Sequence, residues 1–144
     1  MSNPVMEWMQ ANLNKPMSEA PTPVGRWLNG TLREAKQDEL VGDFTVRPEM
    51  TNPLGWLHGG MTALIMDDFI GAMIFALGRE DFYTTVDLSI DYFATAREGD
   101  VVTAKTRLVK PGKQIIYAEC DLFDAGGRLL ARGRTNLVRL EKRD

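Results

Sequence analysis

The sequence predicts an α+β protein in which an antiparallel sheet of about six strands curls round one long central helix, with a short helix near the N-terminus. Two observations predict this arrangement. Residues 60–77 form a continuous apolar run without strand-like alternation, which indicates a buried helix of about five turns. Residues 82–140 then contain four successive strand-like segments joined by short turns, which is typical of an antiparallel meander.

The composition indicates one globular domain and excludes several kinds of chemistry. The chain has 144 residues, of which 44% are hydrophobic and 26% charged, and its net charge of −3 offers no surface for nucleic acid. Cys120 is the only cysteine, so no intrachain disulfide can form. We expect a cytoplasmic protein, because no secretory signal pattern is visible. His58 is the only histidine, which excludes zinc sites built from several His or Cys ligands.

The first part of the chain differs in composition from the rest. Residues 1–25 are predicted to form a short helix, which starts at Ser2 or Asn3 with Pro4 in its first turn, followed by an extended proline-rich linker. This helix could dock on the domain or on a partner, or remain mobile. The domain itself is predicted to cover residues 26–144.

Six strands are expected. Two lie within residues 27–47, with a turn near residues 38–39, and four follow the helix at residues 82–93, 101–109, 114–123 and 128–140. In the first strand after the helix, strict alternation places one set of side chains on each face. One set is Thr84, Val86, Leu88, Ile90 and Tyr92, and the other is Thr85, Asp87, Ser89 and Asp91.

The central run begins after a tight loop and offers few polar side chains. Pro53 and Gly55 shape the loop, and Gly78 is a natural stop for the helix. Because only one threonine and the pair Asp67-Asp68 interrupt the run, we expect the helix to be buried on most sides. We expect no membrane span, since two adjacent carboxylates at the midpoint of a span are costly in lipid.

Two features of this run could carry chemistry. Gly59 and Gly60 let a ligand approach the backbone where helical N–H groups are unpaired and the helix dipole favours negative charge. Asp67 lies mid-helix among apolar residues, where a carboxylate needs a partner or a reaction. Each feature alone also has an ordinary structural explanation, a tight loop or a carboxylate bonded to Thr62 or to backbone.

The spacing Asn52-x2-Gly55-x2-His58-Gly59-Gly60-x6-Asp67, followed by four strands, resembles the hotdog-fold acyl-CoA thioesterases, in particular the phenylacetate-degradation (PaaI-like) type. The resemblance covers about residues 27–140. It implies hydrolysis of an acyl-CoA thioester without a cofactor or metal, since coenzyme A is part of the substrate. It also implies a homodimer in which the sheets of two subunits are continuous, itself paired into a homotetramer.

The resemblance also implies roles for individual residues. Asp67 would be the catalytic carboxylate, attacking directly or through water, and the Gly59 N–H would polarise the thioester carbonyl. His58 and Asn52 would orient the substrate or the water. Thr85 matches a threonine or serine that the family often has early in the strand after the helix, with Thr84 as the alternative.

The distance between two of these residues requires a second subunit. Gly59 and Asp67 are eight positions apart, which is about 12 Å along a helix. One thioester carbonyl needs both groups within roughly 3 Å of its reacting atoms. An antiparallel copy of the helix, related by a two-fold axis, would bring one Asp67 near the other Gly59 and create two composite sites. Asp68 lies about 100° further round the helix and is predicted to be structural, bonded to backbone or to a strand.

Substrate-binding residues are less sharply indicated. Candidates beside the acyl group are Gly60, Trp56, Met61 and Met66, although methionines here are more often core filler. Candidates for the coenzyme A phosphates are Arg97, Lys105, Arg107, Lys110, Lys113, Arg128, Arg132 and Arg134, any of which could simply be solvated. Two other functions remain open: a hydratase or dehydratase of acyl thioesters, and a binding protein without catalysis.

Overall fold

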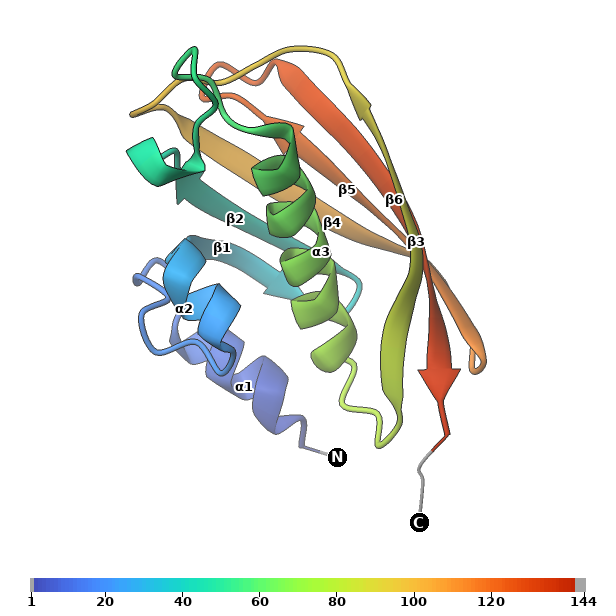
Figure 1. Cartoon of the computed structure of the whole chain (residues 1–144). Helices are drawn as coiled ribbons and strands as arrows, with labels where there is room; N and C mark the ends of the chain where they lie inside the picture. The colour runs from blue at the N-terminus through green and yellow to red at the C-terminus, as the bar shows by residue number, and fades with distance from the viewer. Residues whose placement is uncertain (1, 142–144) are drawn as a thin grey trace.

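A single six-stranded antiparallel sheet carries a long helix on one face (Figure 1). The computed structural model describes residues 2–141; Met1 and residues 142–144, which the predicted boundaries include, lie outside the described residues. The helices are α1 (Pro4–Ala11), α2 (Pro23–Leu28) and α3 (Gly59–Phe75), with a 3-10 turn at Pro48–Met50. The strands are β1 (Thr31–Lys36), β2 (Glu39–Thr45), β3 (Phe82–Tyr92), β4 (Val101–Pro111), β5 (Ile115–Phe123) and β6 (Leu129–Leu140).

The strand order is β1-β2-β4-β5-β6-β3, so β1 and β3 form the two edges of the sheet. All five pairings are antiparallel. The predicted α+β fold with a central helix is therefore confirmed. The four strands after α3 lie within a few residues of their predicted positions.

Two glycines in the sheet set how closely α3 packs against it. A Cβ atom built on Gly133 of β6 would lie 2.6 Å from the Sδ atom of Met66, and one on Gly42 of β2 would lie 2.8 Å from Cζ of Phe69. Both helix residues are buried, Met66 completely. Because there is no room for a methyl group at either glycine, these contacts fix the depth and the rotation of α3.

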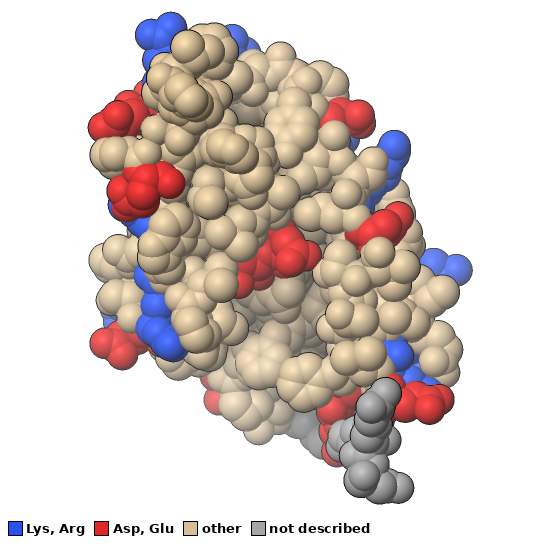
Figure 2. Space-filling model, in the orientation of Figure 1, with Lys and Arg blue, Asp and Glu red and all other residues tan. Residues whose placement is uncertain are grey.

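This rotation leaves one stripe of α3 exposed. Gly60, Asp67, Gly71 and Phe75 follow helical spacing and all lie at the surface. Figure 2 shows this face as largely uncharged, with acidic atoms in a hollow over the middle of α3. The prediction that the helix is buried on most sides is correct toward the sheet and wrong along this stripe, so Asp67 is exposed in the single chain.

The N-terminal helix docks on the domain, one of the three predicted possibilities. The Oδ1 atom of Asn3 accepts a hydrogen bond from the Met6 N–H at 3.2 Å and caps α1, with Pro4 next to it as predicted. The Nδ2 atom of Asn3 donates to the Ala76 carbonyl at the end of α3, at 2.7 Å. Met9 is buried in the core, so α1 is held at its start and along its face.

The prediction of an extended linker up to Gly25 is wrong from Pro23 onward, whereas the two strands predicted within residues 27–47 are confirmed. Residues Pro23–Leu28 form α2, whose first turn is capped by the Thr22 hydroxyl, which accepts from the Gly25 N–H at 3.0 Å. Proline at the first helical position after a threonine cap favours a helix start, and here it does not mark an extended segment. The first strand follows at Thr31.

Strand β3 contains a bulge that the strict alternation missed. Thr85 pairs with Leu137 and Asp87 with Asn136, so Val86 has no opposite residue in β6. The extra residue changes which face the following side chains take. Thr85 therefore points toward α3, as do Ile90 and Tyr92 further along, whereas the alternation had placed Thr85 on the opposite face from them.

Candidate active site

The loop before α3 is organised by the Asn52 side chain. Its Oδ1 atom accepts hydrogen bonds from the N–H groups of Leu54 at 3.0 Å and Trp56 at 3.1 Å. Gly55 has φ of 77°, a conformation that favours glycine, which allows the chain to turn back toward the helix. The carbonyl oxygen of the Asn52 amide is thus used within the loop, and its NH₂ group is the part that could face a substrate.

His58 caps α3 and uses up one of the two glycine N–H groups. The Nδ1 atom of His58 accepts from the Gly60 N–H at 2.9 Å, so the neutral imidazole carries its proton on Nε2. The N–H groups of Met61 and Thr62 donate to the His58 carbonyl. Within residues 2–141 no acceptor receives the Gly59 N–H, which leaves it as the free donor at the positive end of the helix.

Tyr92, at the end of β3, also contacts this helix start, a role that the sequence did not indicate. Its phenol donates to the Gly59 carbonyl at 2.7 Å. Partial burial raises the pKa of the Tyr92 phenol, which keeps it protonated and able to donate. A cavity of about 330 Å³ lies here, lined among others by Asn52, Gly59, Thr62 and Tyr92.

Asp67 and Thr85 form the second group of site residues. The Thr85 hydroxyl donates to the Oδ1 atom of Asp67 at 2.9 Å, a contact that favours Thr85 over Thr84 as the family's threonine. Both side chains line a second cavity of about 620 Å³, which Trp8 and Met9 of α1 also line. The carboxylate is thus oriented by a neighbouring strand while it remains open to solvent in the single chain.

Asp68 lines the same larger cavity as this pair but lies against a different element. The Oδ2 atom of Asp68 lies against Gly25 of α2, 3.6 Å from where a Cβ atom would be. Asp68 was predicted to bond to backbone or to a strand, but within residues 2–141 its carboxylate makes neither hydrogen bond. Burial, and to a smaller extent the negative charge of Asp67, raise the pKa of the Asp68 carboxyl. The two adjacent carboxylates therefore have different surroundings, in agreement with their separation around the helix.

One chain thus holds two separate groups of candidate site residues. Gly59 lines the smaller cavity and Asp67 the larger one. The predicted acyl neighbours Trp56 and Met61 line neither cavity, and Met66 is completely buried in the core. The structure therefore does not support a substrate contact for Met66.

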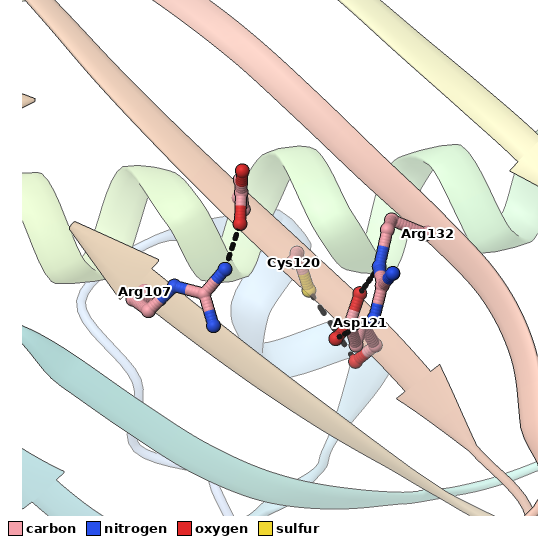
Figure 3. Close-up of polar contacts among 5 residues, drawn as sticks. Arg107, Cys120, Asp121 and Arg132 are labelled. Carbon is pink, nitrogen blue, oxygen red and sulfur yellow. Dashed lines mark hydrogen bonds and ion pairs between the residues drawn. The ribbon is translucent and has the colours of Figure 1, made fainter. Parts of the chain in front are cut away.

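Several of the candidate phosphate-binding side chains already pair with carboxylates on the sheet. Arg107 pairs with Glu119, and Arg132 with Asp121 at 2.8 Å; Figure 3 shows these two arginines flanking β5. Lys105 and Arg128 pair with Glu39 and Asp124 at 3.5 and 3.3 Å. Arg97 lies elsewhere, in the segment that bridges to Trp56 of the loop before α3. It is therefore the candidate cation whose backbone pairs with the loop before α3.

Other chemistry is less well supported. Cys120 is fully buried, and burial together with the negative charge of Asp121 raises the pKa of its thiol well above the usual range. Residues 2–141 contain no group of three His, Cys, Asp or Glu side chains able to hold a metal ion. None of the helices described here has both the length and the apolarity to cross a membrane.

Comparison with known proteins decides the family. The sequence model of the thioesterase superfamily matches residues 54–131, more than half of the chain. The chain belongs to the thioesterase superfamily. The match begins in the loop that Asn52 organises, and includes α3 and β3, the elements that carry Gly59, Asp67, Thr85 and Tyr92.

Individual members of the superfamily agree with this. The chain is 32% identical to mouse acyl-coenzyme A thioesterase 13 over 105 residues, which cover 72% of this chain and 75% of that protein. The crystal structure of mouse thioesterase superfamily member 2 has a TM-score of 0.76 and 28% identity, covering 98% of this chain and all of that one. Escherichia coli PaaI has a TM-score of 0.75 at 18% identity, over 94% and 92% of the two chains, and shows the shared fold. The predicted hotdog fold and the predicted thioesterase family are confirmed.

Proposed function

We propose that this member of the thioesterase superfamily hydrolyses an acyl-CoA thioester to a free acid and a thiol. The observation that carries the proposal is the pairing of an oriented carboxylate with a free helix donor. Thr85 holds Asp67 on the exposed stripe of α3, and the same helix begins with the Gly59 N–H, which has no acceptor among the residues that the structure describes. The 32% identity to a protein named as an acyl-coenzyme A thioesterase supports the choice of substrate class.

In the proposed reaction these two groups act on opposite sides of the thioester carbonyl. The Gly59 N–H donates to the carbonyl oxygen, on which negative charge develops as the carbon becomes tetrahedral. Asp67 either takes a proton from the attacking water or attacks the carbon itself. The C–S bond then breaks, and the sulfur leaves as a thiol with the proton that Asp67 took from the water. If Asp67 attacks the carbon itself, the sulfur takes its proton from solvent, and water then hydrolyses the mixed anhydride on Asp67 to the free acid. No cofactor is required for these steps.

The site is proposed to be shared between two subunits of a homodimer. Gly59 and Asp67 of one chain are too far apart for one carbonyl, and they line different cavities. Strand β3 is an edge of the sheet, and exposed apolar side chains lie along it, with Phe82 70% and Val86 65% exposed. A two-fold partner meeting this edge and the exposed stripe of α3 would cover both. Pairing of two dimers into a tetramer, and a cytoplasmic location, complete the proposal.

A panel of acyl-CoA thioesters, aryl and straight-chain, with a thiol-reporting dye tests this function. We expect thiol release from saturated acyl-CoA substrates. An absorbance change with an enoyl-CoA and no thiol would instead indicate a hydratase. Binding of the whole panel without thiol release would indicate a binding protein and would contradict the proposal.

Arg97 is proposed to contact a phosphate group of coenzyme A, because it lies beside the loop that leads to Gly59. Losing a charge-assisted hydrogen bond costs about 1.5–3 kcal/mol, so Arg97→Gln should raise KM for acyl-CoA about tenfold or more with kcat little changed. The KM for the matching N-acetylcysteamine thioester, which has no phosphate, should stay constant. Arg132→Gln, which removes a cation paired with Asp121, is the control. An equal effect on both substrates would contradict this role.

A further inference from the structure

We infer that Tyr92 is a positioning residue for the oxyanion donor: its phenol and the His58 imidazole hold the Gly59–Gly60 peptide from both sides and so fix the direction of the Gly59 N–H. The inference rests on the proposed thioester hydrolysis, in which that N–H acts on the carbonyl oxygen.

The two contacts act on the two polar ends of one peptide unit. Tyr92 Oη donates to the Gly59 carbonyl at 2.7 Å, and the Gly60 N–H donates to His58 Nδ1 at 2.9 Å. Because a peptide unit is planar, a bond at each end fixes its plane. The preceding peptide, which carries the Gly59 N–H, is held at its other end, since the His58 carbonyl accepts from Met61 at 2.9 Å and Thr62 at 3.1 Å.

This support matters because two successive glycines are the least restrained backbone a helix can begin with. Gly59 and Gly60 are both exposed, and helix ends fray when they lack partners. A donor to a developing oxyanion is effective only if it is already aligned, within about 2.7–3.1 Å of the charged oxygen. Loss of one of the two bonds should therefore lower the fraction of molecules in which the Gly59 N–H is aligned.

The bulge in β3 is what brings Tyr92 to this position. Because Val86 is an extra residue, Thr85 before it and Tyr92 after it both point toward α3. Thr85 bonds to Asp67 near the middle of the helix and Tyr92 bonds to Gly59 at its start. One strand thus orients both functional parts of α3.

The test compares Tyr92→Phe with Tyr83→Phe. Each substitution removes one phenol oxygen from β3; that of Tyr83 donates to the Lys113 carbonyl at 2.8 Å, away from the start of α3. For Tyr92→Phe we expect kcat to fall about tenfold and KM to change less than twofold, because the oxyanion contact strengthens only in the transition state. Tyr83→Phe should keep kcat within twofold of the wild type.

A second readout follows the peptide without using activity. Amide hydrogen exchange of Gly60 should be at least several-fold faster in Tyr92→Phe and unchanged in Tyr83→Phe. Wild-type kcat and Gly60 protection in Tyr92→Phe would overturn the inference. A lower kcat with unchanged Gly60 protection would also overturn it, since Tyr92 would then act on the substrate directly. Gly60 could lose protection in Tyr92→Phe while the wild type releases no thiol from any acyl-CoA. In that case the proposed function is wrong, but the structural role of Tyr92 at the Gly59–Gly60 peptide is supported.

Discussion

Replacing Asp67 by asparagine is expected to lower kcat by about 10³-fold, within the range of 10²–10⁴ that a positioned acid or base contributes. The amide keeps the shape of the side chain and can still accept the Thr85 hydrogen bond, but it can neither take up a proton nor attack efficiently. Because Asp67 is exposed in the single chain, the substitution should leave folding intact. Thiol release measured together with urea unfolding separates an effect on catalysis from an effect on stability.

Asp68→Asn is the matched control for this experiment. It removes the neighbouring carboxylate, which faces Gly25 of α2 and not Thr85. We expect kcat to remain within about threefold of wild type, since within residues 2–141 no hydrogen bond joins the Asp68 carboxylate to Asp67 or Thr85. A larger loss from Asp68→Asn than from Asp67→Asn would reverse the assignment of the two carboxylates.

Gly59→Pro is expected to lower kcat by about 10²–10³-fold, the usual effect of removing one oxyanion donor. Proline removes the N–H and is well tolerated at the first position of a helix. The residue before a proline must be extended, and His58 already is, with φ of −63° and ψ of 136°. A Cβ atom at Gly59 would lie 3.5 Å from the Tyr92 hydroxyl, an ordinary contact. Gly59→Ala adds a Cβ atom but keeps the N–H, so its smaller loss of activity measures the cost of the Cβ atom.

Mixing the two inactive variants tests whether the site is shared. In a heterodimer of Asp67→Asn and Gly59→Pro subunits, one site contains both defects and the other contains neither. Equal mixing makes about half of the dimers heterodimers, each with one working site, so roughly a quarter of wild-type activity should return. No recovery, with heterodimers demonstrated by mass spectrometry, would show that each subunit works with its own residues.

The sequence was sufficient for the parts of the structure that depend on strong local patterns. The apolar run of α3 and the cap at Asn3 have such patterns, and so do the four strands after α3. The six-residue helix α2 was missed because two prolines dominate a segment whose helix depends on one threonine cap. The bulge at Val86 has no sequence signature, since a residue of any type can be the extra residue of a bulge.

The candidate site shows the same division between local pattern and spatial contact. His58, Gly59 and Asp67 could be selected from their spacing alone, and the structure brings Thr85 to Asp67. Tyr92 could not be found, because its contact with Gly59 joins residues 33 positions apart. The exposure of Asp67 could not be predicted either. The other residues of the exposed stripe are glycine and phenylalanine, which in a sequence are typical of a buried helix face.

The bulge also limits which insertions and deletions β3 can accept. Edge strands usually tolerate changes of length, since only one side is paired. Here Thr85 and Tyr92 share a face only because Val86 is an extra residue, so gaining or losing one residue between Asp87 and Tyr92 would turn one of them to the outer face of the sheet. We therefore expect natural variants of this chain to differ in length at the turns on either side of β3, and not within it.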